Sequence, residues 1–89
     1  MEVGFCYIPD YHPEVHGGYA QWYARLLREW RLIDRLGFDA IWIAEHRYPG
    51  YGFSSPPVVA QAIASATERV RVGTAVSLIS QRHPILSAE

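Results

Sequence analysis

The chain has 89 residues, of which 49% are hydrophobic and 19% charged, a composition typical of globular proteins rather than disordered, collagenous or membrane proteins. Its formal net charge is −1, and its eight basic residues are all arginines, which we expect to be spread along the chain and not clustered on one segment or face, so we expect no nucleic-acid partner. No apolar run of the length of a signal peptide core follows a basic start, and no stretch approaches the roughly 18 apolar residues of a membrane span, so we expect a cytoplasmic protein with no membrane partner.

The first expected element is a strand from Val3 to Ile8, a short apolar run that Pro9 and Asp10 end. Such a continuous run predicts a strand buried on both faces. Cys6 is the only cysteine, which excludes an internal disulfide, and it is expected to be a small buried side chain. Residues 11–18 hold two histidines, a proline and a glycine pair, which is the composition of a loop.

An amphipathic helix is predicted next, because apolar side chains recur at steps of three and four. They are Trp22, Tyr23, Leu26, Leu27, Trp30, Ile33 and Leu36, and the polar face is expected to carry Arg25, Arg28, Glu29 and Asp34. Gly37 follows directly and suits the left-handed position that ends many helices.

A second buried strand is expected over residues 40–44, followed by a long loop. Ser55 is predicted to cap a second helix that has Pro56 and Pro57 in its first turn and runs to about Thr67. A third strand is predicted from Arg71 to Ile79, and Pro84 marks another helix start, five residues before the last residue of the sequence.

This order predicts an α/β fold with parallel strands, the N-terminal β-α-β-α-β portion of a (β/α)₈ TIM barrel. Eight such units would need roughly 250–300 residues, so residues 1–89 are expected to form a partial barrel domain, truncated at the start of its third helix. A small doubly wound α/β domain is the alternative. Because three parallel strands leave one face and two edges uncovered, the isolated chain is expected to be molten, unstable or associated.

In either architecture the ligand site lies at the carboxyl ends of the strands. The three segments expected there, residues 9–18, 45–55 and 77–83, hold all four histidines together with Asp10, Glu14 and Glu45. Glu45 and His46 are adjacent, and a carboxylate can fix the tautomer of a neighbouring imidazole. Adjacent strand residues point to opposite faces, so a buried structural role for Glu45 and a rim position for His46 stay open.

Other chemistry finds less support in the sequence. His12, His46 and His83 could join one carboxylate around a metal, but no compact ligand spacing is present and no metal is expected. Tyr48, Tyr51 and Phe53 could line a pocket or only pack within their loop. No phosphate-binding glycine motif occurs, so residues outside this sequence would have to hold a cofactor phosphate.

Three segments in register resemble the bacterial luciferase-like flavin-dependent monooxygenases. They are G-F-D-A-I-W-I-A-E-H-R at 37–47, A-S-A-T-E-R-V-R-V-G-T-A-V at 64–76 and H-P-I-L-S-A-E at 83–89. The resemblance implies a barrel that binds reduced FMN, forms a flavin (hydro)peroxide with O₂ and oxygenates a small organic substrate. The protein would position the flavin, exclude water and relay protons.

His46 matches the family's proposed acid-base histidine at the end of the second strand. Ala75 and Val76 match a non-prolyl cis peptide that lies against the flavin ring, and Glu45 is grouped with them as a candidate cofactor-binding residue. Arg47 stands where many relatives have a second histidine and could contact an anion.

The family's phosphate-binding residues lie later in the barrel, so the fragment is expected to be inactive alone and to bind FMN weakly. The deazaflavin F420 is the alternative cofactor, and a non-catalytic remnant or flavin-binding protein is the alternative from another class. A flavin reductase partner and a homo- or heterodimer of the full-length parent are further implications of the resemblance.

Overall fold

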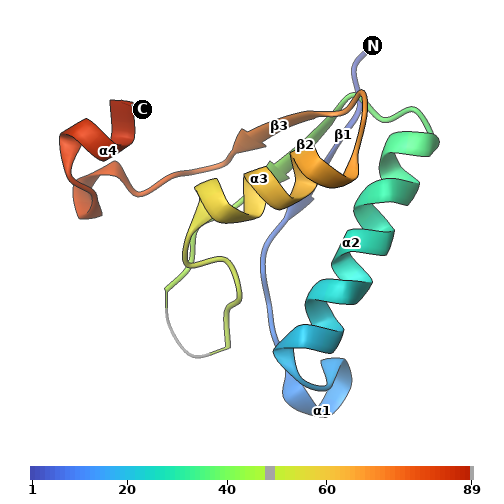
Figure 1. The fold of residues 1–89 in the computed structure, drawn as a ribbon, viewed down its shortest axis with the longest axis horizontal. Helices are drawn as coiled ribbons and strands as arrows, with labels where there is room; N and C mark the ends of the chain where they lie inside the picture. Colours follow the sequence, from blue (N-terminus) through green and yellow to red (C-terminus); the bar gives the residue numbers. More distant parts are fainter. Residues whose placement is uncertain (48–49, 89) are drawn as a thin grey trace.

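The computed structural model describes residues 1–47 and 50–88, in which parallel strands alternate with helices (Figure 1). The elements in chain order are β1 (Gly4–Tyr7), α1 (Pro13–His16), α2 (Tyr19–Arg35), β2 (Ala40–Ile43), α3 (Pro56–Ala66), β3 (Arg71–Thr74), a 3₁₀ turn η1 (Ile79–Gln81) and α4 (Pro84–Ala88). The strands pair in parallel in the order β1-β2-β3. The predicted β-α-β-α-β order is therefore confirmed, and the helix expected at Pro84 begins there.

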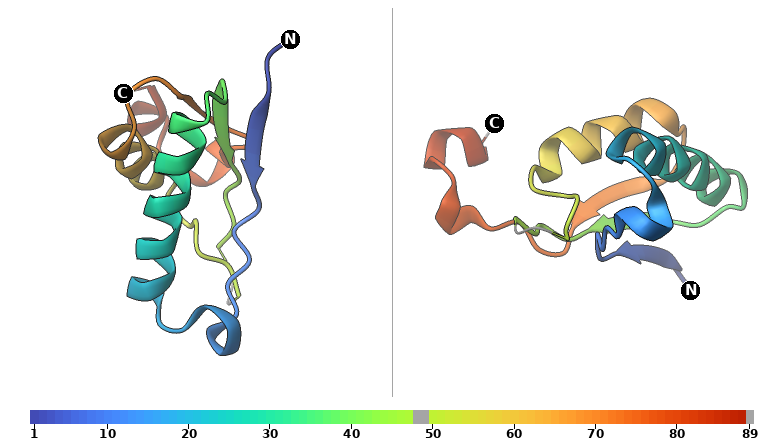
Figure 2. Two further views of the ribbon diagram at one scale, coloured as in Figure 1. Left: turned by 90° about the vertical axis from the view of Figure 1, so that its right-hand side faces the viewer. Right: turned by 90° about the horizontal axis from the view of Figure 1, so that it is seen from below.

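Helices α2 and α3 lie side by side on one face of the sheet, and no helix of the described residues covers the other face (Figure 2). The core between helices and sheet has fully buried side chains from every layer, namely Trp30, Ile41, Ile43, Phe53 and Ile63. The expectation that β1 is buried on both faces is wrong, since Gly4, Phe5 and Cys6 are all exposed. The apolar sequence of β1 suits two covering layers, and the described residues supply one.

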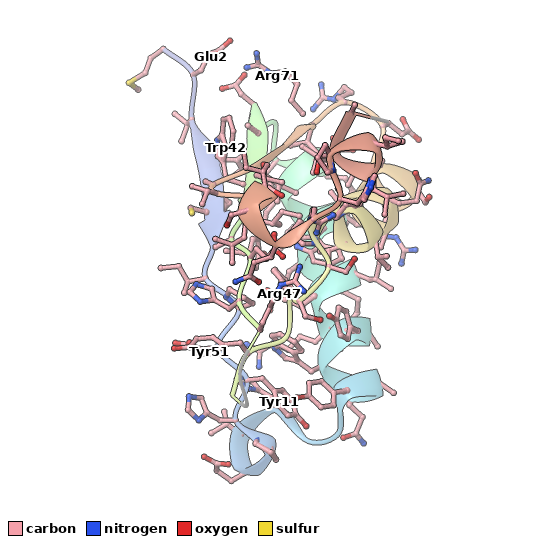
Figure 3. The ribbon with its side chains drawn as sticks, turned by 90° about the vertical axis from the view of Figure 1, so that its left-hand side faces the viewer. Glu2, Tyr11, Trp42, Arg47, Tyr51 and Arg71 are labelled. Atoms are coloured by element: carbon pink, nitrogen blue, oxygen red, sulfur yellow. The ribbon has the colours of Figure 1, made fainter. Side chains whose placement is uncertain are left out.

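Trp42 is the largest side chain on the uncovered face of the sheet, and 44% of its surface is exposed. It stands between Gly4 and Gly73, at either of which an added Cβ would press on the indole ring. In Figure 3 Trp42 lies toward the end of the sheet marked by the Glu2–Arg71 ion pair, while Arg47 and Tyr51 lie toward the opposite end. The two ends of the sheet thus differ in their side chains, with an exposed ion pair at one end and the polar loops after the strands at the other.

The predicted amphipathic helix is confirmed as α2, whose buried residues include Trp22, Leu26, Trp30 and Ile33. Gly37 follows it with a positive φ of 85°, as expected for the residue that ends a helix. The placement of Asp34 on the polar face is wrong, because Asp34 is buried. Its carboxylate accepts the backbone N–H groups of Glu68, Arg69 and Val70, at 2.9, 3.1 and 2.9 Å, and so fixes the turn into β3.

The arginines are less evenly spread in space than in sequence. Four of the eight, Arg28, Arg31, Arg35 and Arg69, line one surface hollow of about 660 Å³ together with Asp34 and Glu68. The expectation that the basic residues do not cluster on one face is therefore wrong. Residues three, four and seven apart share one face of a helix, which brings Arg28, Arg31 and Arg35 together, and the tertiary fold adds Arg69.

Three local expectations also differ from the structure. The predicted loop at 11–18 contains the short helix α1, and Tyr11 in front of it is buried in the core. Ser55 occupies the N-cap position of α3, with Pro56 and Pro57 in the first turn, but its side chain makes no capping hydrogen bond. The third strand ends at Thr74 instead of Ile79, although Ala75 and Val76 still share backbone hydrogen bonds with the end of β2.

Within the described residues, no helix combines the length and the apolar character needed to cross a bilayer.

Candidate functional site

The loops that follow the three strands meet at the carboxyl end of the sheet. The loop after β1 joins the loop after β2 through an antiparallel bridge between Asp10 and Tyr51. The N–H groups of Tyr11 and Gly52 reinforce it by donating to Gly50 and Pro9 carbonyls, at 2.8 and 3.0 Å. The loop after β3 is joined to the end of β2 through Glu45. The predicted meeting of these segments is confirmed.

His46 is half-buried at the end of β2. Its backbone N–H donates to the Phe53 carbonyl at 3.1 Å, and its ring stacks on Tyr51 with 4.6 Å between centroids and 18° between planes. None of the described residues forms a hydrogen bond with its ring nitrogens. The stack fixes the plane of the imidazole, and neither ring nitrogen is bonded to a residue of 1–47 or 50–88, an arrangement suited to proton transfer.

Ala75 and Val76 extend β3 beyond its last strand residue, and both are exposed. The peptide bond between them is cis, as the resemblance implies. The Ala75 N–H donates to the Ile43 carbonyl at 2.9 Å, and the Glu45 N–H donates to the Val76 carbonyl at 3.2 Å. The pair is therefore tied to the end of β2, close in the backbone to His46.

Glu45 forms no hydrogen bond with His46, and its buried carboxylate takes part in an ion network with Arg47 and Arg82. Its side chain has no exposed surface. One carboxylate oxygen accepts from Arg47 Nε and Nη2, at 2.9 and 2.5 Å. The other oxygen accepts the Leu78 N–H at 2.8 Å and the Ser77 hydroxyl at 3.4 Å, and lies 3.6 Å from Arg82 Nη2. Direct cooperation between Glu45 and His46 is absent from this arrangement of the described residues.

The environment of Glu45 keeps it ionised. Burial by itself would raise the pKa of the carboxyl, but the Leu78 N–H, the hydrogen bonds from Arg47 and the charges of Arg82 and Arg47 outweigh burial and hold this pKa below its ordinary value. The result is one carboxylate between two guanidinium groups. A buried carboxylate with such partners is stable only as long as they stay in place.

The other candidate residues are distributed differently. Phe53 is fully buried against Trp22 and Trp30 of α2, so it belongs to the core instead of lining a pocket or packing only within its loop. Tyr48 lies outside the described residues. Asp10 and Glu14 are exposed, and so are His12 and His83. No group of three His, Cys, Asp or Glu side chains within 1–47 and 50–88 is placed to hold a metal ion.

Three partners of Glu45 were not predicted from the sequence. Arg82 is in the predicted loop after the third strand but was given no role, and Ser77 and the Leu78 N–H were assigned to the strand. Arg82 could have been predicted, because the loop after β3 was expected to lie beside Glu45, and a buried carboxylate needs a positively charged partner. A backbone N–H leaves no signal in a sequence.

Known proteins similar to this chain include monooxygenases. A family model described as luciferase-like monooxygenase matches residues 1–89. The alkanal monooxygenase alpha chain of Photorhabdus laumondii is 35% identical over 66 residues, which are 73% of this chain and 18% of that protein. The 4-hydroxyprotoasukamycin monooxygenase of Streptomyces nodosus is 35% identical over 72 residues, or 80% and 19% of the two chains.

Two solved structures share the fold. The monooxygenase RslO1 from Streptomyces bottropensis superposes with a TM-score of 0.88 at 32% identity, covering 99% of this chain and 27% of that one. The oxygenating constituent of 3,6-diketocamphane monooxygenase from Pseudomonas putida, solved in complex with FMN, gives a TM-score of 0.85 at 22% identity, covering 99% and 24%. This chain thus spans about a fifth to a quarter of the proteins it matches.

Proposed function

Because the chain belongs to the luciferase-like monooxygenase family, we propose that it forms part of the active site of a flavin-dependent monooxygenase. The proposal covers residues 1–89 as one part of a single barrel domain. Reduced FMN would supply the chemistry with O₂ that oxygenates a small organic substrate. The observation that carries the proposal is the joining of the His46 segment to the Ala75–Val76 segment at the carboxyl end of a parallel sheet.

The residues present fit one wall of a flavin site. The exposed pair Ala75 and Val76 offers small apolar side chains to a flat ring, and the imidazole of His46 is held by Tyr51 with its nitrogens available. We propose Ala75 and Val76 as cofactor-binding residues and His46 as the catalytic acid-base group. Glu45 would serve the cofactor through the backbone that it holds, since its carboxylate is covered.

The role of this chain would be positional and electrostatic. Its backbone would place the flavin ring, and His46 would hold or move a proton at one of its own imidazole nitrogens beside the flavin. The phosphate of the cofactor would be bound by residues outside the described set. A flavin reductase and a second subunit are proposed partners on the same basis, the family membership.

The test uses the complete gene product with reduced FMN, an aliphatic alkanal and limonene as probes, and O₂ uptake and oxygenated product as readouts. Replacing His46 with Ala is expected to lower substrate-dependent turnover by about 10²-fold or more, the usual contribution of an acid-base group. His12→Ala is the matched control, because His12 is exposed and its ring lies near Glu14 and His16 in the loop after β1, with 3.6 Å between its Nδ1 and the Glu14 carboxylate.

Three outcomes would contradict the proposal in different ways. Turnover of the His46→Ala protein equal to that of the unchanged protein would remove His46 from the mechanism. Hydride transfer with reduced F420 and no O₂ uptake with reduced FMN would assign the protein to the deazaflavin alternative. Absence of activity and of flavin binding in the unchanged protein would indicate a non-catalytic relative.

A further inference from the structure

The loop after β3 is held to the end of β2 mainly by one side chain, that of Glu45. The carboxylate contacts two residues directly after the Ala75–Val76 pair, the Ser77 hydroxyl and the Leu78 N–H. It also contacts Arg82 farther along the same loop. The backbone N–H of Glu45 binds the Val76 carbonyl at 3.2 Å. One residue therefore fixes the segment after β3 both through its main chain and through its side chain.

The same carboxylate restrains the loop after β2. One of its oxygens accepts two hydrogen bonds from Arg47, and this contact spans His46, the residue between them. The side chains on both sides of His46 are thus joined to each other, its own N–H donates to the Phe53 carbonyl at 3.1 Å, and the Tyr51 stack holds the ring itself. The orientation of His46 and the position of Val76 thus depend on a group that touches neither side chain.

No other described carboxylate could take over this function. The remaining ion pairs of the described residues join Arg25 to Glu29, Arg71 to Glu2 and His12 to Glu14, and none involves Arg47 or Arg82. Arg82 is only 17% exposed, and its Nε is buried with no hydrogen-bond partner among the described residues. Loss of the Glu45 charge would leave this guanidinium buried and unpaired, a state that displaces the loop toward water.

We propose that Glu45 is a positioning residue, which sets the distance between His46 and the Ala75–Val76 wall by binding Arg47 on one side and Leu78 and Arg82 on the other. The proposal rests on the proposed function, because the object being positioned is the flavin-binding wall. It assigns Glu45 no contact with flavin or substrate.

The experiment compares FMN binding and the FMN spectrum in variants of the complete gene product. Glu45→Gln keeps the shape and one acceptor but removes the charge, and Glu45→Asp keeps the charge on a shorter side chain. We expect Glu45→Gln to weaken FMN binding about tenfold and to change the visible circular dichroism of the bound flavin, because an unpaired buried charge displaces the wall. Glu45→Asp should recover part of both signals.

Two controls separate positioning from general loss of stability. Glu68→Gln makes the same chemical change at an exposed glutamate and should leave the flavin signals unchanged. Ile63→Val removes one methyl group from a fully buried core position and should lower the melting temperature without changing FMN affinity or the flavin spectrum. All titrations are made well below the lowest melting temperature of the set.

Each outcome decides the matter. FMN affinity and spectrum that are the same in Glu45→Gln and in the unchanged protein overturn the proposal. Equal losses in Glu45→Gln and Ile63→Val also overturn it, since they indicate destabilisation alone. If Glu45→Gln does not fold, Glu45→Asp decides by the same criteria. An unchanged protein that binds no flavin refutes the proposed function and this inference with it, whereas normal binding with silent Glu45 variants refutes the inference only.

Discussion

Gly52, in the loop after β2, and Gly73, in β3, offer a paired test of packing against a buried and a half-exposed tryptophan. A Cβ added at either residue would lie within 3.0 Å of a tryptophan ring, Trp22 in the first case and Trp42 in the second. The two indole rings differ in their freedom to rotate, because Trp22 is 5% exposed and Trp42 is 44% exposed. An overlap with a buried ring must be relieved by the surrounding core, and an overlap with a half-exposed ring by rotation toward solvent.

We therefore expect Gly52→Ala to lower the free energy of unfolding by about 2–3 kcal/mol, near the upper end for overpacked cores, and Gly73→Ala by about 1 kcal/mol. The backbone at Gly52 cannot retreat, since its N–H binds the Pro9 carbonyl at 3.0 Å and its own carbonyl accepts the Tyr23 hydroxyl. Gly18→Ala is the control, because a Cβ there meets nothing within 4 Å. It should change the free energy of unfolding by no more than about 0.5 kcal/mol.

The assay is urea unfolding of the complete gene product and the three variants, followed by far-ultraviolet circular dichroism and compared at a common slope. Gly52 also adjoins Tyr51, so the displaced loop should disturb the stack on His46 and lower turnover in Gly52→Ala beyond what Gly73→Ala loses. A Gly73→Ala variant as unstable as Gly52→Ala, or less stable, would refute the reasoning from ring burial.

Three further predictions follow from the same structure. Ile63→Ala should cost about 2–5 kcal/mol of unfolding free energy in the urea assay, because the residue is fully buried, and a loss below 1 kcal/mol would contradict its place in the core. The pKa of Asp34 is lowered from 3.8, mainly by the hydrogen bond from the Glu68 N–H. Burial acts to raise this pKa, and the Val70 and Arg69 N–H groups lower it further. The ionised form therefore stabilises the fold above that value, and the stability difference between the unchanged protein and Asp34→Asn should shrink as pH falls below about 4; a difference that grows in acid would refute this assignment. The 89 residues in isolation should show no cooperative urea transition at low micromolar concentration and no micromolar FMN binding in a fluorescence titration, since one face of the sheet is uncovered. A cooperative monomeric transition, or such binding, would contradict that expectation.

The fold was accessible from the sequence because its signals are local. The apolar spacing of α2, the Gly37 that ends it and the prolines that begin α3 each act within a few residues of chain. Short apolar runs between helices then required parallel strands. The same local reasoning failed where burial depends on a second layer, as at Cys6, which is exposed although its sequence neighbours are apolar.

In the candidate site too, the features set by local sequence were predictable and those set by tertiary contacts were not. The sequence by itself determined the parallel order of strands and helices, the end of the sheet where polar loops meet and the presence of His46 there, because periodicity and connectivity fix these features. The tertiary structure alone decided which groups touch. It turned Glu45 toward Arg47, Leu78 and Arg82 instead of His46, and it buried Asp34 beneath the turn into β3. Apart from the contact with Arg47, two positions away, those contacts join residues more than 30 positions apart, often through backbone N–H groups that every residue type shares, so only the folded chain could specify them.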